Sequence, residues 1–344
     1  MNGGPNHYQD RPAGDGIERI AESVKKGQVV LFLGAGVHAS KPAPPGQPEP
    51  PPDPRRPLFA GALAEALARE TRWTERFPEK PPKDHFQRVA LDYELNIILD
   101  EQWKDWEKKG KNQGLPQPLA PPAAQSEAIK LRSDGRERLG DAVKRAVTVG
   151  KTPSPALRAL AELNFPLIIT TNYDRLFEEA LLSVDPPKKP RTSVYQPKSN
   201  APPEDFPDPS PEYPFIFMIH GDINTPKSLV ITDEDYIDFV LQMTAPGNYN
   251  PVPQTFYYRL AIWPTLFIGY SLLDYNLRLL LKTLRHKKDG FPRSYSIDPW
   301  PDPLVARVWD SELGYVGFFA NNLWEFVPEL YRQVKGCDMP SYGE

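Results

Sequence analysis

Short, continuous runs of apolar residues alternate with amphipathic segments along most of the chain. A continuous apolar run is typical of a strand that is buried on both faces, as in a parallel sheet. Such runs predict strands at residues 29–33, 167–171, 215–220, 228–231 and 265–269, and further short strands are predicted at 294–297 and 315–318. Helical spacing of apolar residues predicts helices at 17–26, 155–163, 174–182, 233–241, 253–263, 274–287 and 323–334. This alternation predicts an α/β fold with a doubly wound, mainly parallel sheet covered on both faces.

The segment between the first two predicted strands has a different pattern. It shows helical spacing at 58–71, 84–109 and 136–147 and no strand pattern, which predicts a helical insertion beside the sheet. We therefore expect a disordered leader (1–15), a sheet domain in two pieces (16–40 and 151–335), a Pro-rich loop with the helical insertion (41–150) and a tail (336–344).

Proline is abundant, with 42 residues in 344, and it is concentrated at 42–57, 116–122, 186–211 and 299–303. Proline lacks a backbone N–H and is poorly tolerated inside helices and central strands. These clusters predict extended surface loops between the regular elements.

Charge, apolar run length and cysteine content argue against several classes of protein. The net charge is -4 with 25% charged residues, so direct binding of nucleic acid or of an anionic membrane is not expected. No apolar run approaches the roughly 20 residues of a membrane helix. Cys337 is the single cysteine, which rules out an intramolecular disulfide and a four-cysteine zinc site. We expect a cytoplasmic protein without a bound metal.

Small, polar or titratable residues follow four of the predicted strands. They are Gly34-Ala35-Gly36-Val37, Thr171-Asn172-Tyr173-Asp174, His220-Gly221-Asp222 and Gly269-Tyr270-Ser271. Ligands of open α/β sheets bind at the carboxyl ends of the strands, so these residues are expected to meet at one rim. The glycine turn favours close approach of a pyrophosphate, although alone it is equally compatible with a plain tight turn. It lacks the GxGxxG fingerprint of dehydrogenases.

These segments together resemble a known family. LFLGAG (31–36), TTNYD (170–174), HGD (220–222) and GYSLLDYNLR (269–278), with SLVITDEDYIDF (228–239), are similar to the sirtuin superfamily. The similarity is closer to the SIR2-like NADase branch of bacterial anti-phage defence systems, and it covers residues 15–40 and 155–335. It implies a Rossmann-like, sirtuin-type fold that takes NAD as a substrate.

The resemblance also implies roles for single residues. Asn172 would bond the nicotinamide ribose and position an attacking water, and His220 would be the general base or a ribose-hydroxyl partner. The remaining residues would bind NAD: Gly34, Ala35, Gly36 and Val37 at the pyrophosphate, Asp174 at the carboxamide, and Gly269 and Ser271 on the adenosine side.

The chain departs from the sirtuin pattern in three places. The zinc ribbon is impossible with one cysteine, which argues against peptide deacylation. His38 stands where sirtuins commonly have serine, and we expect a structural or surface role for it. The loop after the glycine turn is rich in proline, and Arg55 or Arg56 could reach a phosphate from it.

The resemblance implies an NAD glycohydrolase that releases nicotinamide and ADP-ribose and acts as a defence effector by depleting NAD. Two alternatives stay open: a zinc-free NAD-dependent deacylase or ADP-ribosyltransferase, and a non-catalytic module that senses NAD or ADP-ribose. The resemblance further implies a homo-oligomer, with a HerA-type ATPase or another sensor protein as partner, as in a SIR2–HerA system.

Overall fold

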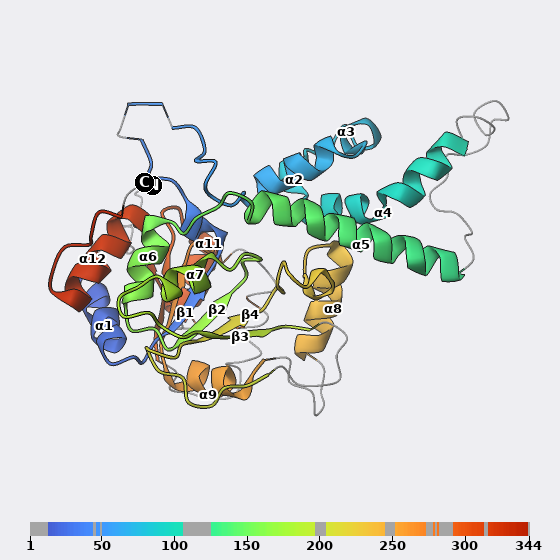
Figure 1. Cartoon of the computed structure of the whole chain (residues 1–344). Coiled ribbons are helices and arrows are strands. Elements are labelled where there is room, and N and C mark those ends of the chain that lie inside the picture. Colours follow the sequence, from blue (N-terminus) through green and yellow to red (C-terminus); the bar gives the residue numbers. More distant parts are fainter. Residues whose placement is uncertain are drawn as a thin grey trace.

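A parallel sheet forms the centre of the protein. The computed structural model describes residues 13–43, 46–48, 50–105, 125–196, 204–244, 252–272, 278, 281, 292–312 and 316–342. Its strands are β1 (Val30–Leu33), β2 (Leu167–Thr170), β3 (Arg191–Val194), β4 (Phe215–Met218), β5 (Thr265–Ile268), β6 (Ser294–Ile297) and β7 (Val316–Phe319). They pair in the order β3-β4-β2-β1-β5-β6-β7, and each pair is parallel (Figure 1). The predicted doubly wound sheet is confirmed.

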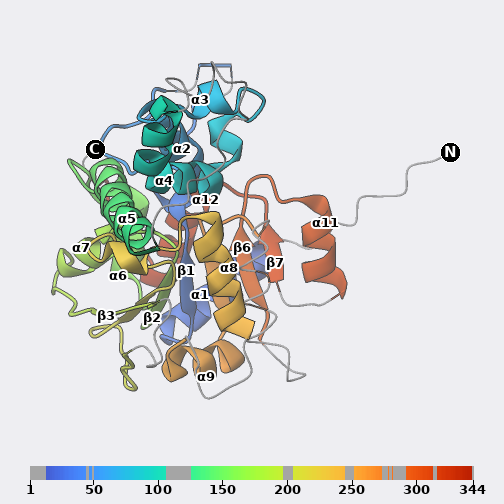
Figure 2. The ribbon, with the colours of Figure 1, turned by 90° about the vertical axis from the view of Figure 1, so that its right-hand side faces the viewer.

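Helices lie on both faces of this sheet. One face packs on α1 (Ala13–Lys25), α6 (Pro155–Glu162), α7 (Leu176–Leu182) and α12 (Leu323–Lys335). The other packs on α8 (Asp233–Thr244), α9 (Gln254–Ile262), α11 (Pro303–Ala306) and η6 (Arg307–Glu312). Figure 2 shows α8 in front of the sheet. Strands β1, β2, β4 and β5 are buried at every position, because both of their faces are covered.

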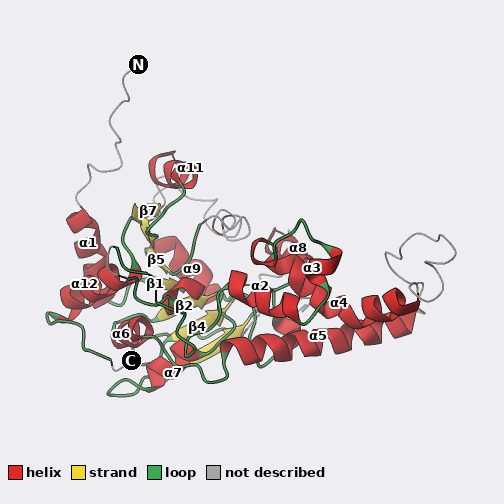
Figure 3. Cartoon of the chain, turned by 90° about the horizontal axis from the view of Figure 1, so that it is seen from above, coloured by secondary structure: helices red, strands yellow, loops and turns green. Residues whose placement is uncertain are grey.

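The predicted helical insertion is a separate group of helices beyond the sheet. It contains α2 (Ala60–Arg69), α3 (Trp73–Arg76), η2 (Pro82–Asp84), α4 (Phe86–Asp105) and α5 (Gln125–Val147). Figure 3 shows α5 running beside α2 and α4 and away from the sheet. These helices share a third apolar cluster, centred on Trp73 and Val89, which also takes in Leu229 and Ile231 from the segment after β4. The insertion is therefore packed against the part of the chain that follows His220.

Some predicted boundaries were wrong. The predicted strand at 228–231 is the end of η5 (Pro226–Ser228) followed by a loop; the N–H of Val230 donates to the carbonyl of His220 outside the strand pairs of the sheet. Strand β3 was missed because it lies inside the Pro-rich range 186–211. Helix α1 begins at Ala13, inside the range expected to be a leader, and α5 begins well before residue 136. Most of the predicted helix 274–287 lies outside the described residues.

The order of the strands fixes the place of a binding site. β1 lies between β2 and β5, and the chain builds the sheet outward from β1 first on one side and then on the other. Such a reversal opens a crevice at the carboxyl ends of the strands. The four strands that carry the polar motifs are adjacent, in the order β4-β2-β1-β5, so the predicted convergence on one rim is confirmed. Among the described helices, none combines the length and apolar character needed to cross a lipid bilayer.

Candidate active site

The glycine turn after β1 packs directly on the end of β5. A Cβ on Gly34 would lie 2.4 Å from the carbonyl oxygen of Gly269, and one on Gly36 would lie 2.8 Å from its Cα. Gly269 has φ +69°, and a Cβ on this residue would lie 2.1 Å from the backbone nitrogen of Val37. The N–H of Gly36 donates to Gly269 O (2.8 Å), and those of Gly34 and Val37 also donate within the protein. The glycines thus let two strand ends meet; phosphate binding by this turn stays a prediction.

The turn continues into the short helix η1 (Ala35–His38), which is held in place from both sides. The hydroxyl of Ser154, at the start of α6, donates to the carbonyl of Val37 (2.9 Å). The indole of Trp324 in α12 donates to the carbonyl of Ala39 (3.2 Å). The His38 side chain is consequently buried, with 2% of its surface exposed.

Asn172 lies next to this histidine. Its backbone N–H donates to Thr170 Oγ1 (3.0 Å), which turns the chain at the end of β2. Its Nδ2 lies 3.4 Å from the carbonyl oxygen of Gly34 and 3.3 Å from His38 Nε2. Its Oδ1 is buried and has no hydrogen-bond partner among the described residues. The contact of His38 with Asn172 was missed by the sequence analysis, because the two residues are 134 positions apart. The available signal was the position of His38 just after the glycine turn at the end of a predicted strand.

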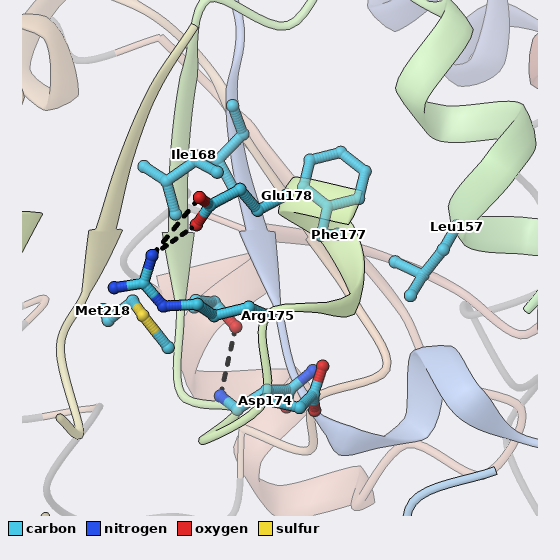
Figure 4. A pocket seen from close by; sticks show the side chains of 10 residues that line it. Leu157, Ile168, Asp174, Arg175, Phe177, Glu178 and Met218 are labelled. Carbon is cyan, nitrogen blue, oxygen red and sulfur yellow. Dashed lines mark hydrogen bonds and ion pairs between the residues drawn. The ribbon is translucent and has the colours of Figure 1, made fainter. Parts of the chain in front are cut away.

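Asp174 completes this cluster. Its Oδ2 lies 3.3 Å from His38 Nε2, and its Oδ1 accepts the N–H of Leu176 (3.0 Å) at the start of α7. Asn172 and Asp174 line a cavity of about 20 Å³, together with apolar side chains of β2, β4, α6 and α7 and the polar side chains of Thr170, Arg175 and Glu178. In Figure 4 the Arg175 guanidinium reaches toward Glu178 and away from Asp174.

His220 lies at the neighbouring strand end. It follows β4 by two residues as Asn172 follows β2, and β2 and β4 are paired in register. Its ring is buried and meets the rings of Tyr236 and Phe239 in α8 edge-on, with centroids 5.4 and 5.5 Å away. Asn172 borders the face covered by α6 and α7, whereas His220 borders the face covered by α8. A ligand that contacts both must lie across the rim, over the ends of β2 and β4.

The two segments that carry Asn172 and His220 are joined to each other. The hydroxyl of Tyr173 donates to the carbonyl of Val230 (2.9 Å), and the N–H of Ile223 donates to the carbonyl of Tyr173 (3.1 Å). Arg175 donates to Asp222 Oδ2 (2.7 Å), and this hydrogen bond raises the pKa of the guanidinium. These contacts hold the two predicted catalytic residues in a fixed relation.

Arg136 of α5 ties the segment after His220 to the insertion. It contacts Glu94 Oε2 (3.0 Å) and Asp235 Oδ2 (2.8 Å), and it also donates to the carbonyls of Pro226 (3.2 Å) and Leu229. Burial lowers the pKa of Arg136, but the two carboxylates outweigh burial and raise it, so the group stays charged.

Comparison with known proteins agrees with this geometry. Residues 166–315 match the family model of the SIR2-like domain. The chain contains a SIR2-like domain. The match includes the segments of Asn172, Asp174 and His220, whereas the glycine turn and the helical insertion lie outside it.

Several proteins are similar to part of this chain at low identity. The protein named NAD(+) hydrolase ThsA from Acinetobacter baumannii is 27% identical over 154 residues, which is 44% of this chain and 28% of ThsA. Defense-associated sirtuin 2 from Bacillus subtilis is 26% identical over 160 residues, 45% of this chain and 14% of the relative. ThsA from Bacillus cereus is 27% identical over 187 residues, 52% of this chain and 36% of the relative. The chain thus matches about a third or less of each relative's length.

The other residues that the sequence analysis singled out do not take part in the contacts with Asn172 or His220 described above. Gly269 contacts the glycine turn, and Ser271 is exposed just beyond it. Arg56 is bonded to the carbonyls of Thr152 (2.9 Å) and Pro153 (3.2 Å), so it is committed to holding the loop. Within the described ranges, no group of three or more His, Cys, Asp or Glu side chains is arranged to hold a metal ion.

Proposed function

We propose that this chain is an NAD glycohydrolase that releases nicotinamide and ADP-ribose. The observation that carries the proposal is the partly exposed Asn172, whose buried amide oxygen lacks a partner among the described residues, at the rim where β4, β2, β1 and β5 end. The family match and the relatives named NAD(+) hydrolase support NAD as the substrate.

The reaction needs few groups from the protein. When the bond between ribose C1′ and the pyridinium nitrogen breaks, its electron pair goes to nicotinamide, which leaves as a neutral molecule and needs no acid. The ribose passes through an oxocarbenium-like state, as in glycoside hydrolysis. Asn172 holds a ribose hydroxyl or the attacking water through its amide oxygen. Water attacks C1′, and His220 takes the proton that it releases.

The residues at the rim fit a polar ligand. Asn172 Oδ1 and His38 Nδ1 are both buried without a partner in the described part of the chain, and such atoms are costly unless a ligand or water completes them. The adjoining cavity of about 20 Å³ has the size of a single water. A dinucleotide needs several hundred Å³, so we expect binding to be accompanied by opening of the rim.

The test is nicotinamide release from NAD, followed by HPLC, for the wild type and for Asn172→Ala and His220→Ala. Each substitution should lower kcat by about a hundredfold or more, the range typical of a lost general base. Matched controls are Asn164→Ala, at the amino end of β2, and His85→Ala, in the insertion; both should keep the wild-type rate. Cleavage that survives both rim substitutions refutes the assignment.

Control by assembly is part of the same proposal. An unregulated NADase would deplete the cell that makes it, so we propose that activity requires a homo-oligomer or a partner such as an ATPase or sensor protein, and that the setting is antiviral defence. The name of the Bacillus subtilis relative, defense-associated sirtuin 2, supports this setting. The assay is therefore run across protein concentration, with the oligomeric state measured by light scattering.

A further inference from the structure

A histidine outside the predicted catalytic pair lies against Asn172. We infer that His38 is a positioning residue: next to Asp174, it confines the side-chain amide of Asn172, whose nitrogen faces the carbonyl of Gly34, so that the amide oxygen stays directed at the nicotinamide ribose. His38 Nε2 lies 3.3 Å from Asn172 Nδ2 and 3.3 Å from Asp174 Oδ2. The inference rests on the proposed function and adds a residue for which the sequence analysis expected a structural or surface role.

The orientation of the amide follows from its neighbours. An amide nitrogen only donates and an amide oxygen only accepts. Asn172 Nδ2 lies 3.4 Å from the carbonyl oxygen of Gly34, which is an acceptor. Rotating the amide by 180° would place Asn172 Oδ1 against the carbonyl oxygen of Gly34, and two acceptors would then face each other. Oδ1 therefore faces away from Gly34.

The proton on His38 Nε2 decides which neighbour it bonds. When Nε2 carries the proton it donates to the Asp174 carboxylate, the stronger acceptor. When Nε2 is unprotonated it accepts from Asn172 Nδ2. The amide has the same orientation in both states, because the carbonyl of Gly34 requires the nitrogen on that side in each. His38 thus closes the space into which the Asn172 side chain would otherwise rotate.

His38 is itself a rigid support. Its helix η1 is fixed by Ser154 on one side and Trp324 on the other, and the ring is 2% exposed. Residues that orient metal-ligating side chains are typically worth 10–100-fold in activity, and we expect a loss of the same order for a residue that orients Asn172. The only polar atoms of His38 and Asn172 left without partners among the described residues are His38 Nδ1 and Asn172 Oδ1.

The test compares three substitutions of His38 in the full chain: His38→Gln, His38→Asn and His38→Phe. A glutamine places an amide atom near the position of Nε2, whereas an asparagine reaches only as far as Nδ1. We expect His38→Asn and His38→Phe to lower kcat about 10–100-fold. KM should stay within about threefold, because the support acts on the transition state more than on NAD binding. His38→Gln should restore kcat to within about threefold of the wild type.

The outcomes separate the two claims. Wild-type kcat in His38→Asn, equal impairment of the Gln and Asn variants, or a change confined to KM overturns the role of His38 while leaving the proposed function intact. A wild type that cleaves no NAD under any condition overturns both. Where His38→Phe does not fold, the comparison of His38→Gln with His38→Asn at equal melting temperature decides.

Discussion

The bonds of Arg136 predict a large loss of stability when this side chain is removed. Its guanidinium joins α5 to Glu94 of α4, to Asp235 of α8 and to two carbonyl oxygens of the segment after His220. Only 11% of the side chain is exposed. In Arg136→Met the volume is roughly kept, while two carboxylates and two carbonyls lose their donor.

Breaking a buried ion pair by removing one partner costs about 3–5 kcal/mol. The lower end applies here, because Asp235 still accepts the N–H groups of Ile231 (3.2 Å) and Thr232 (2.9 Å), and Glu94 keeps Arg132 (3.0 Å). We expect a loss of about 3 kcal/mol in the free energy of unfolding. For a chain of this size this corresponds to a fall of about 4 °C in the melting temperature.

The matched control is Arg132→Met, one turn earlier in α5. Arg132 bonds to the same Glu94, but 52% of its side chain is exposed, so its removal should cost less than about 1 kcal/mol. Both variants are compared with the wild type by urea unfolding followed by circular dichroism. Equal midpoints for the two variants would refute the reasoning, because Arg136 is more buried than Arg132 and also bonds to Asp235 and two carbonyl oxygens.

Three further changes have expected outcomes. Gly269→Ala should cost more than about 2 kcal/mol, since φ is +69° and the new Cβ would lie 2.1 Å from the amide of Val37; unfolding within error of the wild type would contradict the close approach of β1 and β5. Burial lowers the pKa of Lys188 to about 8 from 10.5. The unfolded chain therefore binds more protons above pH 8, and stability should rise with pH from about 8 toward 10, by about 1–2 kcal/mol after allowance for solvent screening. Lys188→Met should flatten this rise in urea unfolding series, and an unchanged slope would exclude Lys188 as its source. Tyr342→Phe removes a 2.6 Å hydrogen bond to Glu162 and should cost about 1 kcal/mol by the same measurement, whereas no loss would show that the bond is absent in solution.

The sheet could be predicted from the sequence because its central strands are buried on both faces. Their continuous apolar runs, such as 215–220, have no amphipathic alternative. Strand β3 lacks this signal: it is an edge strand with the sequence Arg-Thr-Ser-Val, and most of its positions are partly exposed. The run at 228–231 has an apolar strand pattern although it forms no strand. Leu229 and Ile231 are apolar because they pack on the helical insertion, and that contact is invisible in the local pattern.

In the candidate site, too, the positions at strand ends could be predicted from the sequence, whereas the contacts between distant residues could not. The strand-end positions of Asn172 and His220 follow from parallel pairing, which the pattern predicts. The contact of His38 with Asn172 depends on the direction of η1, and that direction is set by Ser154, Trp324 and the glycine packing on β5. The glycines are visible in the sequence beside His38, but the contacts with Ser154 and Trp324 have no signal there.

The central claim is that water attacks ribose C1′ of NAD at the rim that carries Asn172. The most direct measurement is the reaction in water enriched in oxygen-18, with the ADP-ribose analysed by mass spectrometry against unlabelled ADP-ribose kept in the same water, because the anomeric hydroxyl of free ADP-ribose exchanges its oxygen with the solvent. The account predicts ADP-ribose that carries the heavy oxygen for the wild type and no ADP-ribose above background for Asn172→Ala. Unlabelled or protein-bound ADP-ribose, or labelled product at the wild-type rate from Asn172→Ala, would contradict it.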